Sequence, residues 1–95
     1  MRNSELAIRF STECSRLIAQ QPGAYEHPEI TLCDEVASAI RGRRRPGRRV
    51  TRRRGTVVLS AAGYECSIIV WQACRSLGLQ IEEDTKSSTS IITLR

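Results

Sequence analysis

The stretch from Gly55 to Leu77 constrains the fold of this chain more than any other. It begins with TVVLS, in which three of the five residues are β-branched. Such an apolar run is typical of a strand that is covered on both faces. A turn of small residues, 61–63, follows, and Gly63 allows a backbone geometry that a Cβ atom would resist. An apolar helix that ends near Leu77 is then predicted.

The apolar residues of this predicted helix fill more than one stripe. A helix of this kind should be covered on two sides, by its own sheet and by a further element. A chain of 95 residues has room for one core only, so the further element is expected to be a second subunit. The residues expected at this dimer or partner interface are Ile68, Trp71, Gln72 and Arg75.

Positive charge is concentrated in one short segment. The net charge is +5, yet nine arginines and no acidic residue lie between Arg41 and Arg54, and the rest of the chain is net acidic. Repulsion among the guanidinium groups, with Pro46 and Gly47 between them, predicts a loop or a splayed hairpin tip over 41–54. Charge that is this local usually has a local partner.

An arginine-rich segment is suited to binding phosphates, because each guanidinium can donate two parallel hydrogen bonds to one phosphate. RNA is favoured over DNA, since flexible arginine-rich segments commonly order on RNA. If about five arginines neutralise phosphates, log affinity should fall with log salt at a slope of about −3.5 to −4.5. The residues expected to bind nucleic acid are Arg43, Arg44, Arg45, Arg48, Arg49, Arg52, Arg53 and Arg54.

Two other functions fit the same run of arginines. The chain could be a protein-interaction adaptor whose basic loop binds an acidic protein surface. The run could also be a nuclear-localisation patch. The acidic residues Glu82, Glu83 and Asp84 are then either a solvated strand end or an internal partner of the arginine loop.

The first twenty residues fit two patterns. The alternation over 6–11 predicts a half-buried strand followed by a helix to Gln21, whereas the spacing of Leu6, Phe10 and Cys14 fits one continuous helix capped by Ser4. Periodicity alone does not decide between them.

The other elements have clearer signals. Apolar residues at helical spacing predict a helix over 29–40, with Pro28 in its first turn and a short strand over 30–32 as the competing interpretation. Gly78 is a favourable helix stop. The chain should then finish with a strand over 79–84, a turn over 85–88 and a strand over 89–95.

The segment GTVVLSAAGYECSIIVWQACRSLG, with the later SIITLR, resembles the C-terminal part of the Alba superfamily. This superfamily includes archaeal chromatin proteins and small subunits of ribonuclease P and MRP. The early AIRFST resembles the first strand of the family, which favours the strand over the helix there. The residues that carry the C-terminal resemblance are Val57, Val58, Leu59, Ser60, Ala61, Gly63, Ile69, Val70, Leu77, Ile91, Ile92 and Leu94.

The resemblance implies a small α/β domain over residues 1–95, a βαβαββ two-layer sandwich. It implies a homodimer, or a heterodimer with another Alba-like subunit. It also implies a non-enzymatic subunit of a ribonucleoprotein that binds RNA or DNA.

No catalytic, metal or cofactor site is expected. His27 is the only histidine, and the four cysteines have no CxxC spacing, so a zinc site lacks ligand pairs. The cysteines suit reduced core positions of an intracellular protein, nuclear or cytoplasmic. The sequence shows no secretory signal or membrane-spanning run.

Overall fold

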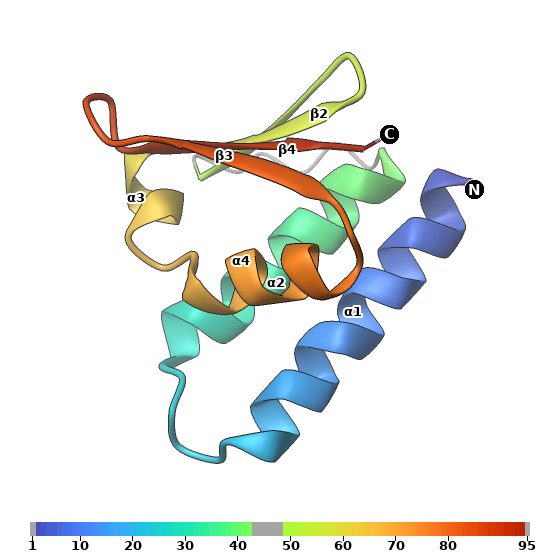
Figure 1. Cartoon of the computed structure of the whole chain (residues 1–95), viewed down its shortest axis with the longest axis vertical. Coiled ribbons are helices and arrows are strands. Elements are labelled where there is room, and N and C mark those ends of the chain that lie inside the picture. The colour runs from blue at the N-terminus through green and yellow to red at the C-terminus, as the bar shows by residue number, and fades with distance from the viewer. Residues whose placement is uncertain (1, 43–48, 95) are drawn as a thin grey trace.

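A four-stranded antiparallel sheet forms one side of the molecule, and helices cover one of its faces (Figure 1). The computed structural model describes residues 2–42 and 49–94. Over these residues the helices are α1 (Asn3–Gln20), α2 (His27–Arg41), α3 (Ala61–Tyr64) and α4 (Ile68–Ser76). The strands are β1 (Val50–Arg53), β2 (Thr56–Leu59), β3 (Gln80–Asp84) and β4 (Thr89–Thr93). The chain is therefore a small α/β domain, as predicted.

The N-terminal segment is one continuous helix, and the predicted strand over 6–11 is wrong. Leu6, Phe10 and Cys14 are buried, whereas Ile8 is 57% exposed. A strand would turn Ile8 to the same face as Leu6 and Phe10, so this burial pattern fits only the helical spacing. The described elements consequently run ααββααββ instead of βαβαββ.

Helix α1 forms an outer tier of the helical side. It packs against α2 and α4, while α2, α3 and α4 contact the sheet (Figure 1). Helix α4 is therefore covered on a second side by α1 of the same chain. We expected a second subunit in that place, and the apolar character of α4 no longer requires one.

The prediction of a helix over 29–40 is confirmed by α2, and the competing strand over 30–32 is wrong. A capping box joins Glu26 to Glu29 at the start, where Pro28 occupies the first turn. Gly42 ends the helix with a left-handed φ of 86°, a conformation that glycine adopts without steric penalty.

The sheet has the strand order β1-β2-β4-β3. Val57, Leu59 and Ile92 point to the helices and are fully buried, whereas Val58 and Ile91 lie on the other face and are partly or well exposed. The prediction that the central strand is covered on both faces is thus wrong for the described residues. All the strand pairs are antiparallel, and an antiparallel sheet can leave one face open.

The predicted small-residue turn forms the single-turn helix α3. Gly63 is buried there, and a Cβ on it would lie 3.0 Å from the carbonyl oxygen of Arg49 and 3.2 Å from Cβ of Leu59. Its φ is not positive. A Cβ here would crowd the backbone at Arg49 and the side chain of Leu59, so this close approach favours glycine without any special backbone angle.

The second half of the predicted arginine loop is a strand. Residues Val50–Arg53 pair with β2 in an antiparallel ladder, and Val50 is buried. Ladder hydrogen bonds and the burial of Val50 outweigh the repulsion among neighbouring arginines, because the exposed guanidinium groups remain hydrated. Residues 43–48 lie outside the described part of the chain.

Three of the four cysteines are buried where α1, α2 and α4 meet, and all four are free. A hydrogen bond to Cys33, together with burial, raises the pKa of the Cys14 thiol. Burial raises the pKa of the Cys74 thiol to about 12. These positions agree with the expected reduced core residues.

The raised pKa of Cys74 makes stability fall at alkaline pH. Above about pH 9 the unfolded chain loses thiol protons that the folded chain retains, so each such thiol should lower the free energy of unfolding by about 1.5 to 2 kcal/mol at pH 10. Urea unfolding at pH 8 and pH 10 measures the loss. Cys74→Ala should be less stable than wild type at both pH values, but its free energy of unfolding should fall less between pH 8 and pH 10. An equal fall in the two proteins would contradict a role of the Cys74 thiol in the pH dependence.

Candidate nucleic-acid interface

The predicted phosphate-binding arginines divide into three groups. Arg53 and Arg54 are exposed at the tip of the β1–β2 hairpin. Arg49 and Arg52 contact other parts of the protein. Four more, Arg43, Arg44, Arg45 and Arg48, lie outside the described residues.

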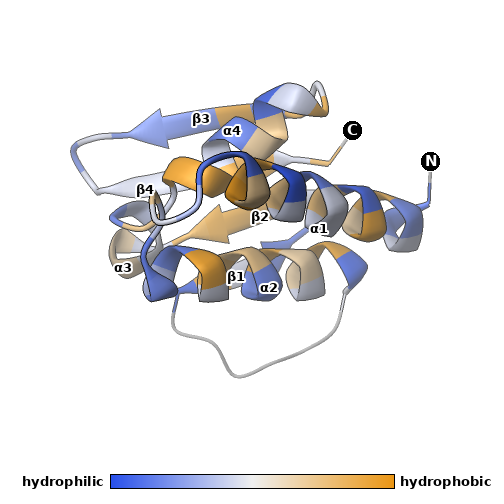
Figure 2. Cartoon of the chain, turned by 90° about the horizontal axis from the view of Figure 1, so that it is seen from below, coloured by the Kyte–Doolittle hydropathy of each residue, from blue (hydrophilic) through white to orange (hydrophobic). Residues whose placement is uncertain are grey.

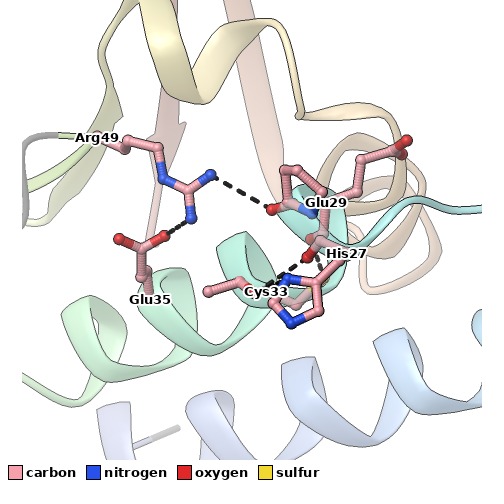
Figure 3. Close-up of polar contacts among 7 residues, drawn as sticks. His27, Glu29, Cys33, Glu35 and Arg49 are labelled. Carbon is pink, nitrogen blue, oxygen red and sulfur yellow. Dashed lines mark hydrogen bonds and ion pairs between the residues drawn. The ribbon is translucent and has the colours of Figure 1, made fainter.

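Arg49 joins the start of β1 to α2. Its guanidinium forms an ion pair with Glu35 and donates a hydrogen bond of 3.3 Å to the carbonyl oxygen of Pro28 (Figure 3). The side chain of Arg49 is 21% exposed and that of Glu35 is 24% exposed. Arg49 therefore has a structural role in the folded protein.

Arg52 binds the C-terminal end of α2. Its Nη1 donates hydrogen bonds to the carbonyl oxygens of Ala39, at 2.9 Å, and Ile40, at 2.8 Å. The last carbonyls of a helix have no partner within the helix and carry partial negative charge. The carbonyl of Ala39 also accepts a hydrogen bond from the N–H of Gly42. The guanidinium thus adds charged hydrogen bonds at the helix end and fixes the hairpin against the helix.

The acidic cluster of β3 is remote from this hairpin. No acidic residue occurs between Glu35 and Glu65 in the sequence. The acidic cluster Glu82, Glu83 and Asp84 lies on β3, at the opposite edge of the sheet from β1. Three strand spacings separate the two edges, or about 14 Å. The acidic cluster is thus not an internal partner of Arg52 or Arg53.

The predicted interface residues lie on one stripe of α4. Ile68 is 59% exposed, and Gln72 accepts a hydrogen bond of 2.7 Å from the hydroxyl of Tyr25. The guanidinium of Arg75 lies over the ring of Trp71, 4.8 Å from its centroid. The structure thus brings these four residues together, with Arg75 packed on Trp71.

Beside this stripe is an open groove of about 520 Å³. Sequence reasoning missed four of its lining residues, because Ser67 precedes α4 and the other three come from other elements. Tyr64 belongs to α3, Glu65 follows α3, and Glu83 belongs to β3. The groove is lined by Tyr64, Glu65, Ser67, Ile68, Trp71, Gln72 and Glu83.

Comparisons of the chain with family models, curated proteins and solved structures found no match. The resemblance to Alba proteins therefore stays a prediction. Within residues 2–42 and 49–94, no group of three or more histidine, cysteine or acidic side chains could hold a metal ion. No helix in the same ranges is long and apolar enough to cross a membrane.

Proposed function

We propose that this protein binds nucleic acid, RNA in preference to DNA, through the basic edge of its sheet, as a non-enzymatic subunit of a ribonucleoprotein. One observation carries the proposal. Arg53 and Arg54 are exposed at the hairpin tip, and the acidic cluster lies at the other edge of the sheet. Within residues 2–42 and 49–94 neither guanidinium forms an ion pair, which leaves both available to phosphates.

The arginines of the run have different roles in this proposal. Arg49 and Arg52 attach β1 to α2 and so hold the hairpin in place. Arg53 and Arg54 face solvent and contact phosphates directly. Arg41, exposed at the end of α2, extends the basic surface toward the remaining arginines of the run, which follow it in the sequence.

The test is a salt titration of binding to a structured RNA. Arg53→Ala with Arg54→Ala should weaken binding about tenfold and reduce the log–log salt slope by about 1.4 to 1.8, because two phosphate contacts are lost. The matched control is Arg16→Ala with Lys86→Ala. It removes the same charge on α1 and in the β3–β4 turn, away from the hairpin, and should change the slope little.

Equal losses in the two double variants would mean that only net charge matters, and would contradict a site at the hairpin. No binding of the wild-type protein at low salt would remove the proposal and leave the two other functions of the arginines, an adaptor that binds an acidic protein surface and a nuclear-localisation patch.

A further inference from the structure

The two edges of the sheet carry opposite charges. Edge strand β1 contains Arg52 and Arg53, and edge strand β3 contains Glu82, Glu83 and Asp84. Each edge strand pairs with one neighbour among the described strands. Figure 2 shows the contrast with the interior, since β2 is hydrophobic and the C-terminal part of β3 is hydrophilic. We propose that β3 receives β1 of a second copy of this chain, head to tail, which extends the sheet.

The strand directions allow this pairing. Every neighbouring pair in the sheet is antiparallel, so β1 runs in the same direction as β4 and opposite to β3. A second copy in the same orientation can lie beside the first, next to its β3. The β1 strand of the second copy is then antiparallel to β3 of the first copy. Its helices stay on the same face as those of the first copy.

One register of this pairing matches both charge and face. Residues that lie opposite one another across the four strands share one face of the sheet. Arg53 and Gln80 belong to one such row, and Arg52 and Ile81 belong to the next. Arg53 and Glu82 therefore lie on the open face, and Arg52 and Glu83 on the helical face. When Glu82 lies opposite Arg53 of the second copy, Glu83 lies opposite its Arg52. Directly opposed pairs of opposite charge stabilise strand pairing.

The groove beside β3 suits a guanidinium on the helical face. Glu83 lines this groove together with Glu65, Tyr64 and Trp71. The two carboxylates provide ion pairs for an arginine side chain, and the ring of Tyr64 provides a cation–π contact, since the guanidinium of Arg75 already lies over Trp71. In the matched register, Arg52 of the second copy lies next to this groove. The Nη1 of this Arg52 continues to bind the end of α2 in its own copy. The other N–H donors of the guanidinium can reach the carboxylates of Glu65 and Glu83 in the first copy.

Symmetric pairing of like edges is disfavoured. Two β1 edges would bring arginines together, and two β3 edges would bring carboxylates together, which destabilises either pairing. Charge on an edge strand normally prevents edge-to-edge association. Here the two edges are complementary, so only the head-to-tail contact is favourable, and it leads to short open chains or closed rings.

Sedimentation velocity of the full chain over a range of concentrations tests the proposal. Wild type should self-associate, and more strongly at low salt. Arg53→Glu and Glu82→Arg should each weaken association at least about tenfold, since each places like charges opposite one another. The chain that carries both changes should recover association to within about threefold of wild type. Far-UV circular dichroism checks that these exposed substitutions leave the fold intact.

Trp71 gives a second, local measurement, because it is the only tryptophan and lines the groove. Its emission should change with protein concentration in wild type and in the doubly swapped chain, and not in either single variant. A wild type that stays monomeric at all concentrations would overturn the proposal. So would stronger association of Arg53→Glu or of Glu82→Arg, which would indicate a symmetric contact, or a double variant that fails to recover.

Self-association and RNA binding share Arg53, so the two should compete at that residue, yet either can fail while the other holds. Glu82→Arg should weaken association at least about tenfold without weakening RNA binding, because it leaves the basic hairpin unchanged. If this variant lost RNA binding but still associated, RNA would bind at the β3 edge and not at the β1 hairpin. That result would contradict the proposed roles of the two edges. Absence of RNA binding in wild type would leave the association experiment valid.

Discussion

Replacement of Phe10 by alanine is expected to lower the free energy of unfolding by about 3 to 5 kcal/mol. Phe10 is the only phenylalanine, and its side chain is fully buried on the inner face of α1. The chain has few other large side chains that could move into the cavity left by the missing ring. Urea unfolding measured by circular dichroism gives the value.

Ile8→Ala is the matched control on the same helix. Ile8 is exposed, so its truncation should change stability by less than about 0.5 kcal/mol. A strand over the same residues would bury Ile8 and Phe10 on one face. Similar large losses in the two variants would therefore contradict the helix and restore the strand.

The second large effect is expected for Arg52→Met, which should destabilise the fold by about 2 kcal/mol. Methionine keeps an apolar stem of similar length but removes the two hydrogen bonds to the last turn of α2. It also leaves two carbonyl groups without their charged donor at the negative end of the helix dipole. Urea unfolding followed by circular dichroism measures the loss.

Arg53→Met is the control for this second prediction. The residue is adjacent on the same strand, but its side chain is exposed, so stability should change by less than about 0.5 kcal/mol. Equal destabilisation by the two variants would mean that the strand, and not the helix cap, is sensitive to methionine. Under the proposed function, Arg53→Met should instead weaken RNA binding.

Together these variants separate two roles within one run of arginines. In the structure, Arg49 and Arg52 contact α2, whereas Arg53 and Arg54 face solvent. A sequence run of like charges cannot show this division, because all its members have the same chemistry. The backbone alternation of β1 and the position of α2 beside it decide which guanidinium groups turn inward.

Local signals in the sequence determined several elements. The helix over 29–40, the strand that begins at Thr56 and the C-terminal hairpin were predictable because helical spacing, β-branched residues and turn residues act over a few positions. The same signals failed for the first helix. Leu6, Ile8 and Phe10 satisfy the period of a strand as well as part of the period of a helix, and only packing against α2 and α4 selects between them.

Tertiary structure alone decided the features on which the proposed function depends. The sequence by itself established an acidic scaffold with one basic segment and an apolar helix near its centre. That β1 and β3 lie at opposite edges, that α1 covers α4, and that Glu83 joins Trp71 in one groove all follow from how the elements pack. Strand order and helix packing arise from contacts between residues far apart in the chain, and no local pattern of residue types encodes them.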